Sequence, residues 1–419
     1  TGNEVYYIDY ATKERCTMNM PPLSDEAFEG DSTDGKIINH DFSLIGSLNS
    51  STAIDNSKKP LIYNDVCLSG ALDDDKGYVD SPLYDFKLNG AVSLSIINVQ
   101  LRGYPYRCAQ TIDSVNDDDS GGNPGAFIDA TVAGAKVVFN HSVVTANNSM
   151  VFVNLQTGTS MEIEDTWFKD CFSRSDATPK KALIEAAGTA TITMKAVRVT
   201  GMRNGVFVKT TLAATLTIAN LGAKWSIFGK TPEGTLVPNA MGEIDFATGT
   251  LSVAKSKFYG NFTARAITAA AKATTGNTIV DSVFENYMGG NGGAVSTDAP
   301  LSVSRTTFKG NKASQGAGIY STKNVSLFDC VFDGNNAVNG SAWIVDAASY
   351  AFAVNPVFVG SQSAVGTAPS CTSAVCDGTG FTQCTKNAGV LTCSVCETGK
   401  FQQTSSSTGV KSCEACPAG

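Results

Sequence analysis

The chain has few of the residues on which most enzymes and nucleic-acid-binding proteins depend. Only two of its 419 residues are histidine, 17% are charged, and the net charge is −8. Neither His40 nor His141 lies near a serine or cysteine in a pattern typical of an activated nucleophile. Because an acidic chain repels the phosphate backbone, we expect no nucleic acid partner. No apolar run reaches the roughly 18 residues that a spanning helix needs, so we expect no membrane span in this segment.

The chain does contain a sequence repeat of about 24 residues, which recurs through its second half. It reads LSVSRTTFKGNKASQGAGIY from Leu301 and VSLFDCVFDGNNAVNGSAWI from Val325, and looser copies begin at Leu251 and Asn277. Each copy alternates apolar and polar residues, as a half-buried strand does, and then passes through a Gly/Asn-rich turn into a second short strand. A fixed period of this length indicates a stacked repeat architecture.

The repeat predicts an all-β fold, a right-handed parallel β-helix, followed by a small disulfide-rich module at the C-terminus. The segments between the strands show no amphipathic helix pattern. One coil cannot bury its apolar face alone, whereas stacked coils share a continuous core. We expect adjacent coils to lie about 4.8 Å apart. One residue per coil anchors the register: Phe332, Phe308, Phe284, Phe258, Trp225, Val199, Phe168 and Val144.

We expect three regions along the chain. Residues 1–130 form an N-terminal cap with irregular coils, two of them around Val92–Val99 and Ile37–Leu48; a separate capping domain is the alternative. Residues 131–366 form the regular β-helix. Residues 367–419 form the cysteine-rich module, which we expect to continue beyond the chain.

Asparagine follows the anchor by three residues in three coils, at Asn261, Asn311 and Asn335. Asparagines stacked at equivalent turns form ladders of side-chain hydrogen bonds, and we expect this structural role rather than ligand binding. In a protein secreted by a eukaryote, we also expect glycans at the sequons of Asn49, Asn140, Asn147, Asn324 and Asn339. Asn261 lies in a sequon too, but a buried ladder residue would be a poor acceptor.

Seven of the twelve cysteines lie in the last 49 residues, where large apolar side chains are scarce. Because this segment cannot form a sufficient hydrophobic core, we expect covalent cross-links or a bound metal to stabilise it. The spacing Cys393-x2-Cys396-x16-Cys413-x2-Cys416 satisfies a zinc-ribbon pattern, but three further cysteines just upstream favour disulfides. The pairing does not follow from the sequence, and free buried thiols are the alternative at Cys171 and Cys330. The expected disulfide cysteines are Cys16, Cys67, Cys108, Cys371, Cys376, Cys384, Cys393, Cys396, Cys413 and Cys416.

The phrases FYGN, FKGN and FDGN, together with GGAV at Gly292 and GAGI at Gly316, resemble the repeats of chlamydial polymorphic outer-membrane proteins. More broadly they resemble right-handed β-helix surface proteins of the pectin-lyase-like kind. The resemblance covers the segment from Leu251 to Ile344 well and the earlier coils weakly. It implies an extracellular adhesive or structural protein and does not imply catalysis.

The phrase from Cys393, CSVCETGKFQQTSSSTGVKSCEACPAG, looks like the ephrin-receptor-like cysteine-rich repeat of large extracellular protist proteins. The marks of this resemblance are CxxCxxGxF, a Ser/Thr/Gly-rich middle and CxxCPAG. In that family the repeats run in tandem and CPAG opens the next one. The resemblance therefore implies that Cys416 pairs beyond this chain, or that the seventh tail cysteine pairs with the body.

The β-helix fold also houses polysaccharide lyases and hydrolases, and hydrolysis needs two carboxylates flanking a groove. The acidic runs of the chain lie in Gly-flanked loops and are weak candidates for a Ca²⁺ site, although consecutive aspartates on a loop are usually just solvated. Neither GxGxxG nor GxxxxGK[ST] occurs, so a nucleotide loop has no support. We expect no catalytic residue, no metal and no cofactor. The six aspartates are Asp73, Asp74, Asp75, Asp117, Asp118 and Asp119.

The sequence therefore favours a non-enzymatic extracellular or cell-surface structural protein, a self-assembling subunit of a filament, flagellar hair or coat. The ends of a solenoid expose strand edges that invite pairing unless capped, so we expect self-association or association with other extracellular structural proteins. The alternative is a carbohydrate-binding adhesin or receptor that uses the β-helix groove, with Tyr259, Tyr287 and Tyr320 as loosely spaced aromatic contacts. A polysaccharide lyase or hydrolase is the third hypothesis.

Overall fold

In the computed structural model, the described residues form β-strands and the turns between them, and none of them forms a helix. The described part of the chain accordingly holds no helix with the length and apolar character to cross a membrane. The described residues are 4–8, 36–38, 41–46, 61–63, 86–102, 126, 128–145, 151–171, 182–202, 206–236, 244–246, 249–262, 264–269, 277–346, 349, 351–354, 356–359, 364–365, 383–387, 390–394, 400–404 and 411–415.

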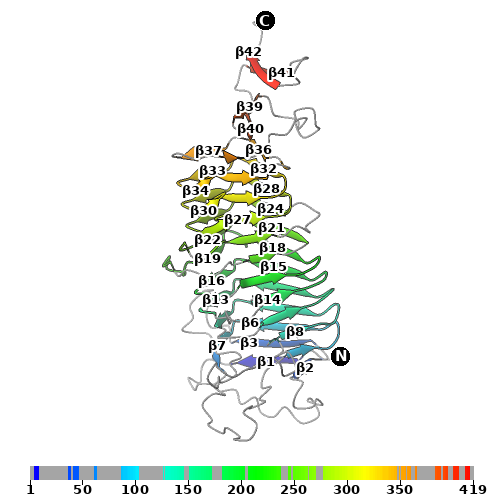
Figure 1. Ribbon diagram of the computed structural model, residues 1–419. Helices are drawn as coiled ribbons and strands as arrows, with labels where there is room; N and C mark the ends of the chain where they lie inside the picture. The colour runs from blue at the N-terminus through cyan, green and yellow to red at the C-terminus, as the bar shows by residue number, and fades with distance from the viewer. Residues whose placement is uncertain are drawn as a thin grey trace, which may run out of the picture. The chain divides into compact units, whose positions relative to one another are not determined.

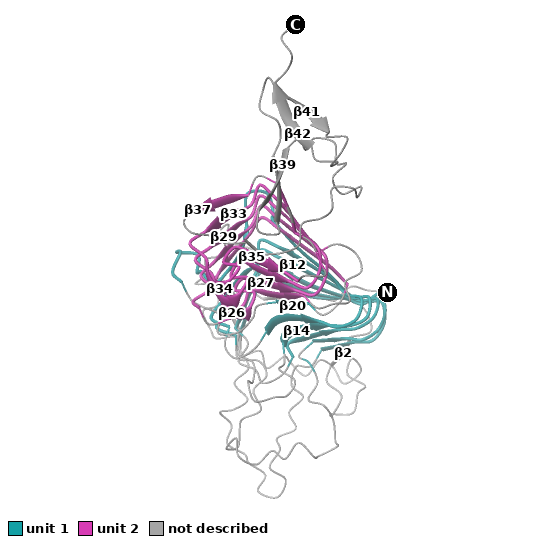
Figure 2. Cartoon of the chain, turned by 45° about the horizontal axis from the view of Figure 1, so that its top comes forward, with its two compact units in different colours: residues 1–246 teal, residues 247–419 magenta. Residues whose placement is uncertain are grey.

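The chain divides into two compact units, residues 1–246 and residues 247–419 (Figure 2). In each unit the chain runs repeatedly through a strand of one sheet, here sheet A, then a strand of sheet C and a strand of sheet B, before it enters sheet A again (Figure 1). One such circuit is a coil, and strands of successive coils pair in parallel. This arrangement confirms the right-handed parallel β-helix that the repeat predicts.

Unit 1 holds the first group of coils, with every pairing inside each sheet parallel. Its sheet A comprises β1 (Glu4–Ile8), β3 (Phe42–Gly46), β6 (Ser93–Ile97), β9 (Lys136–Asn140), β12 (Ser160–Glu164), β15 (Thr191–Lys195) and β18 (Thr215–Ala219). Its sheet B comprises β2 (Lys36–Ile38), β5 (Phe86–Leu88), β8 (Ile128–Ala130), β11 (Val153–Leu155), β14 (Ala182–Ala186), β17 (Val206–Thr210) and β20 (Ile244–Phe246). Its sheet C comprises β4 (Leu61–Tyr63), β7 (Gln100–Arg102), β10 (Val143–Thr145), β13 (Trp167–Lys169), β16 (Arg198–Thr200) and β19 (Ser226–Phe228).

Unit 2 repeats the plan and adds a fourth, three-stranded sheet of β26 (Met288–Asn291), β30 (Lys312–Gln315) and β34 (Asn336–Asn339). Sheet A comprises β21 (Thr250–Ala254), β24 (Asn277–Val280), β28 (Leu301–Ser304), β32 (Val325–Phe328) and β36 (Ala351–Val354). Sheet B comprises β23 (Ile267–Ala269), β27 (Val295–Thr297), β31 (Ile319–Ser321), β35 (Trp343–Val345) and β38 (Ala364–Val365). Sheet C comprises β22 (Ser256–Tyr259), β25 (Val283–Glu285), β29 (Thr307–Lys309), β33 (Val331–Asp333) and β37 (Val357–Val359). Two antiparallel hairpins follow, β39 (Gln383–Asn387) with β40 (Val390–Ser394) and β41 (Lys400–Thr404) with β42 (Lys411–Ala415).

The core of unit 2 is built around a stack of phenylalanines in sheet C. Phe258, Phe284, Phe308 and Phe332 are fully buried and occupy the same register position in four successive coils. Their ring centroids are 4.7, 5.3 and 5.2 Å apart, and neighbouring rings are within 8° of parallel. The repeat length of the sequence thus corresponds to one full coil, and each ring covers the ring beneath it.

The anchors expected in unit 1 are correct at Val144, Phe168 and Val199, which pair in consecutive strands of sheet C. Trp225 was expected to follow them, but this expectation is wrong, because Val199 pairs with Phe228. A tight turn closed by a bridge between Leu221 and Lys224 lengthens this coil and moves the core position three residues onward. Phe228 is fully buried and packs edge-on against Phe207 at 6.1 Å.

The corner between sheets A and C has the same backbone conformation in most described coils. Its first residue lies in the left-handed region, with φ between 43° and 54°, at Asn98, His141, Asp165, Ala196, Lys255, Asp281, Arg305 and Asp329. Asparagine and aspartate enter this region most easily, and they hold four of these eight positions. The next residue in unit 2 is a buried Ser256, Ser282, Thr306 or Cys330.

These small polar residues link one coil to the next. The backbone N–H of Ser256 donates to Ser282 Oγ and that of Ser282 to Thr306 Oγ1, both at 3.3 Å. Each hydroxyl also donates to a carbonyl two residues earlier in its own coil, as Thr306 does to Ser304 O at 2.9 Å. A hydroxyl or thiol is the group that can both accept from the N–H of the preceding coil and donate within its own coil.

A second ladder consists of asparagine side chains. Asn311 Nδ2 donates to Asn335 Oδ1 at 3.0 Å and to the carbonyl of Phe284 at 3.1 Å, and Asn311 Oδ1 accepts from the N–H of Tyr287 at 2.9 Å. Both asparagines are buried. Asn261 does not belong to this ladder, contrary to the sequence expectation. It is exposed and precedes Phe262, whose φ of 56° gives this coil a different turn.

Removal of one ring from the phenylalanine stack should strongly destabilise unit 2. We expect Phe308→Ala to lower the free energy of unfolding by about 3–5 kcal/mol, because it removes a fully buried ring and leaves a cavity. Lys309→Ala, the exposed neighbour on the same strand, is the matched control and should cost less than about 1 kcal/mol. Urea unfolding measures the free energy of unfolding of both variants. Equal losses in the two variants would contradict a stabilising role for the phenylalanine stack.

The asparagine ladder predicts a pH-dependent defect in Asn311→Asp, which keeps the shape of the side chain but turns a donor into an acceptor. A carboxylate there faces the oxygens of Asn335 and Phe284, so the folded state raises its pKa above the unfolded value of about 3.9. The variant should therefore lose stability as the pH rises above about 4, reaching a deficit of about 3 kcal/mol at neutral pH.

Asn336→Asp is the control for this experiment, because Asn336 is exposed on the neighbouring strand. Its stability should follow that of the parent protein across the same pH range. If both variants show the same pH profile in urea unfolding, the ladder does not have the structural role described above.

Candidate functional site

Strand β37 is the most exposed apolar element in the described part of unit 2. It is the terminal strand of sheet C and, within the described part of the chain, pairs with β33 alone. Its three residues, Val357, Phe358 and Val359, are 51%, 42% and 47% exposed. Such values are unusual for large apolar side chains on a strand, since an apolar strand edge is open to pairing with another chain.

The core of the last coils holds β37 in place. The ring of Phe358 packs against Phe332 at 6.0 Å and against Trp343 at 5.5 Å. Val357 and Val359 occupy the register positions of Val331 and Asp333, which face outward. The strand is thus fixed by one inward ring, while its two valines lie on the outer face.

The backbone of β37 offers hydrogen-bonding groups on its far side. The N–H of Val357 donates to Cys330 O at 2.9 Å, and the carbonyl of Val359 accepts from the N–H of Gly334 at 3.4 Å. Because consecutive residues of a parallel strand address opposite neighbours, the N–H and C=O of Phe358 face away from β33. The outer edge of β37 therefore presents an N–H donor and a C=O acceptor with which an additional parallel strand could pair.

The edge of sheet A has a different ending. Strand β40 pairs in parallel with β36, with Phe352 opposite Leu391 and Val354 opposite Cys393. Strand β39 then pairs with β40 in the antiparallel direction. The hairpin therefore takes up the edge that β36 would otherwise present, and the parallel order of the sheet ends there.

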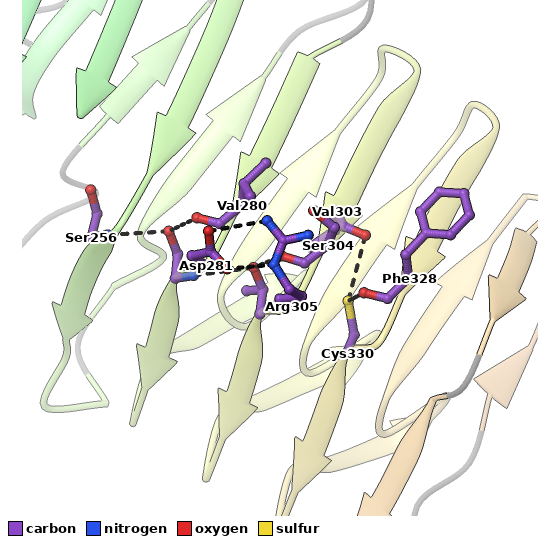
Figure 3. A network of polar contacts seen from close by, with 10 residues as sticks. Ser256, Val280, Asp281, Val303, Ser304, Arg305, Phe328 and Cys330 are labelled. Atoms are coloured by element: carbon purple, nitrogen blue, oxygen red, sulfur yellow. Dashed lines mark hydrogen bonds and ion pairs between the residues drawn. The ribbon is translucent and has the colours of Figure 1, made fainter. Parts of the chain in front are cut away.

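A row of charges of alternating sign runs along the A–C corner of unit 2, at Lys255, Asp281, Arg305 and Asp329. Arg305 Nε and Nη2 donate to the two carboxylate oxygens of Asp281 at 2.6 and 3.1 Å (Figure 3). This hydrogen bond, with the charges of Arg305 and Lys255, holds the pKa of Asp281 below its usual range, and Asp281 raises the pKa of Arg305. Both side chains are solvent-accessible, so the pair contributes little to the free energy of unfolding. We attribute to it instead a preference for the strand register that places Arg305 beside Asp281.

The buried carboxylate of Asp165 is the centre of a charged cluster in unit 1. Its side chain is 4% exposed, and its Oδ2 lies 2.8 Å from Lys224 Nζ and 3.4 Å from His141 Nε2. Nearby, Arg198 Nη1 donates to the carbonyl of Lys230 at 2.8 Å, and burial lowers the pKa of this guanidinium. Lys224 and Lys230 belong to the segment that lengthens this coil. Their contacts with Asp165 and Arg198 therefore hold this segment against the neighbouring coils.

Most of the residues that the sequence analysis proposed for metal or disulfide sites fall outside the described part of the chain. These are Asp73, Asp74, Asp75, Asp117, Asp118, Asp119, Cys16, Cys67, Cys108, Cys371, Cys376, Cys396 and Cys416. Cys384, Cys393 and Cys413 lie in strands β39, β40 and β42. Across the described residues, no three His, Cys, Asp or Glu side chains gather in a way that could hold a metal ion.

The sequons differ in accessibility. Asn339 and Asn261 are exposed, whereas Asn140 and Asn324 are half-buried in the structure. Asn49 and Asn147 lie outside the described residues. Because Asn261 is exposed and outside the ladder, burial does not make it a poor glycan acceptor.

The three tyrosines considered as sugar contacts do not share a face. Tyr287 is 1% exposed and lies in the core. Tyr259 is on β22 of sheet C, whereas Tyr320 is on β31 of sheet B. Stacking of a polysaccharide needs aromatic side chains in one line, and these residues do not provide it.

Cys171 and Cys330 are both buried, and neither forms a disulfide. The thiol of Cys330 lies 3.4 Å from Phe328 O and 3.6 Å from Val303 O (Figure 3). It takes the corner position that Ser282 and Thr306 occupy in the preceding coils. A Ser, Thr or Cys two residues before each of the four phenylalanine anchors signals this shared position in the sequence, although the repeat pattern alone did not predict its role.

Comparisons with known proteins gave no match: no family model, no curated protein and no solved structure matches this chain. A function must therefore be inferred from the fold and from the strand edges described above.

We expect the Cys330 thiol to be unreactive in the folded protein. Burial raises its pKa to about 11, so the reactive thiolate is scarce at neutral pH. Iodoacetamide at about pH 8 should label Cys330 in denaturant and leave it unmodified in the native state, as read by peptide mass spectrometry. Because the folded pKa is the higher one, the thiol's contribution to stability is complete below about pH 9 and is lost as the pH rises towards about 11. Equal labelling rates in both states would contradict this placement.

Proposed function

We propose that the chain is a non-enzymatic extracellular structural protein, a self-assembling subunit of a cell-surface filament, flagellar hair or coat. The observation that carries the proposal is strand β37, a terminal strand with three exposed apolar residues and one neighbour. Burial of two valines and the exposed part of a phenylalanine is favourable at roughly 25 cal/mol per Å². A second strand beside β37 would provide it.

A second copy of the chain is the partner that best fits this edge. Among the described residues, β4 is likewise a terminal strand of sheet C in unit 1, and it pairs in parallel with β7 alone. A β37 edge that accepts the β4 edge of another copy would continue the parallel order. This contact joins two different surfaces and so is head-to-tail. Repeated between copies, it generates an open chain of subunits when the rotation from one copy to the next does not close a ring.

The repeat phrases behind the family resemblance have structural roles, and this supports a scaffold. In FKGN and FDGN the Phe belongs to the ring stack and the Asn to the buried ladder. In GGAV, Gly292 has a φ of 75°, and any side chain at Gly293 would collide with the carbonyl of Ala317. We propose on this basis that the chain is a pectin-lyase-like β-helix surface protein with repeats like those of the chlamydial proteins, followed by an ephrin-receptor-like repeat.

Lysine on the edge strand tests the proposal. We expect purified parent protein to form fibres or sheets in negative-stain microscopy. Val357→Lys/Val359→Lys should remain monomeric in sedimentation, because lysine on an edge strand disfavours pairing with another chain. Both substitutions lie on the outer face and spare Phe358, so the fold should persist. Leu212→Lys is the matched control, since Leu212 is a 65% exposed turn residue of unit 1, and it should assemble like the parent.

Two outcomes would overturn the proposal. One is a parent protein that forms only isolated monomers, and the other is a double lysine variant that assembles as well as the parent. In the first case, hits on a glycan array would support the carbohydrate-binding adhesin, and release of products from acidic polysaccharides in the presence of Ca²⁺ would support a lyase or hydrolase.

A further inference from the structure

The register of the β39–β40 hairpin brings two cysteines together. The five residues of Gln383–Asn387 pair with those of Val390–Ser394 in the antiparallel direction, and Cys384 lies directly opposite Cys393. A shift of one residue would separate them. No sequence spacing predicts this pairing, since seven tail cysteines allow many connectivities.

We infer that Cys384 and Cys393 form a disulfide across this hairpin. Directly opposite residues of an antiparallel pair share a face, and their Cα atoms are about 4.5 or 5.5 Å apart depending on the type of pair. Both values lie within the range of about 4.4–6.8 Å that disulfides require. The backbone therefore needs no rearrangement to accept the bond.

Formation of the bond is an oxidation. The two thiols lose two protons and two electrons, and a sulfur–sulfur bond forms between Sγ of Cys384 and Sγ of Cys393. The electrons pass by thiol–disulfide exchange to a glutathione or protein disulfide, which is reduced to two thiols. The inference rests on the proposed function in one respect, the oxidising extracellular route, because cytosolic thiols stay reduced.

The same register argues against the zinc ribbon that the spacing of the tail also permits. That site needs Cys393 together with Cys396, Cys413 and Cys416. Cys393 has Cys384 as its partner in the hairpin, whereas Cys413 of β42 lies opposite Gln402 of β41. A cysteine committed to a disulfide cannot ligate zinc as a thiolate.

The disulfide would determine which strand edge of unit 2 stays open. Cys393 lies opposite Val354 of β36, so the bond joins β39 to the strand that covers the edge of sheet A. With both hairpin strands tied together, β40 is held against β36. Strand β37 of sheet C ends in no such hairpin within the described residues. The oxidised protein would then present β37, and not β36, for association.

Thiol counting in denaturant, without reductant, tests the pairing on the full chain. Cys384→Ser should expose one thiol more than the parent, because Cys393 loses its partner. Cys384→Ser/Cys393→Ser should return the count to that of the parent. Cys384→Ser/Cys396→Ser is the matched control, and it should expose more thiols than the parent, because Cys393 again lacks its partner.

Non-reducing peptide mapping gives the second readout. Cleavage after Phe381, Lys386, Leu391 and Lys400 isolates Cys384 in one peptide and leaves Cys393 and Cys396 in another. We expect these two peptides to be linked, with fragmentation placing the bond on Cys393. In Cys384→Ser, the amides of residues 351–354 should exchange with deuterium about tenfold faster than in the parent, because the covering hairpin opens more often.

The outcomes separate this inference from the proposed function. Disulfide-bonded protein in which Cys384 is joined to another cysteine overturns the pairing and leaves the structural role standing. Bound zinc with free Cys384 overturns it in favour of the ribbon. Native material with all tail thiols reduced overturns both the pairing and the extracellular route.

Discussion

Every coil of this protein has to place its inward side chains directly above those of the coil before it. Parallel pairing in register brings like residues together, so that phenylalanine lies on phenylalanine, asparagine on asparagine and hydroxyl on hydroxyl. An error in an interior coil would be felt in both neighbours, because Phe284 and Phe308 each stack on a ring in the coil before and a ring in the coil after. The left-handed corner residues make this possible. They turn the chain at the same point in most described coils, and their backbone N–H groups bond to the next coil, as Arg305 does to Phe328 O at 2.8 Å.

The sequence was sufficient for the architecture because the repeat length is a physical property of the coil. Four phenylalanines at nearly constant spacing predicted one anchor per coil at a shared register position. The asparagines after three of them predicted a ladder, which is present at Asn311 and Asn335 but not at Asn261. The sequence failed where a coil changes length. The turn at Leu221–Lys224 moved the anchor from Trp225 to Phe228, and the turn at Phe262 displaced Asn261.

Other features left no readable signal in the sequence. The strand at Lys312–Gln315 is a mixed run of small and polar residues without alternation, so its place in a fourth sheet follows only from its partners in neighbouring coils. The candidate site shows the same limit. Val357, Phe358 and Val359 look like any buried strand, and only their position at the end of sheet C makes them an exposed edge.

Sheets A and C of unit 2 end differently, and the proposed function rests on this difference; sheet B ends at β38. The edge of sheet A leads into a hairpin with opposed cysteines, whereas the edge of sheet C ends in an apolar strand. In the proposed assembly, the edge of sheet C would accept the next subunit, whereas the hairpin would keep the edge of sheet A from pairing.

X-ray fibre diffraction from oriented assemblies of the protein tests this account most directly. Head-to-tail growth through the ends of the coils places the strands across the fibre axis, so the reflection near 4.8 Å should lie on the meridian. A 4.8 Å reflection on the equator would mean that the subunits associate side by side, and it would contradict assembly through the strand edges.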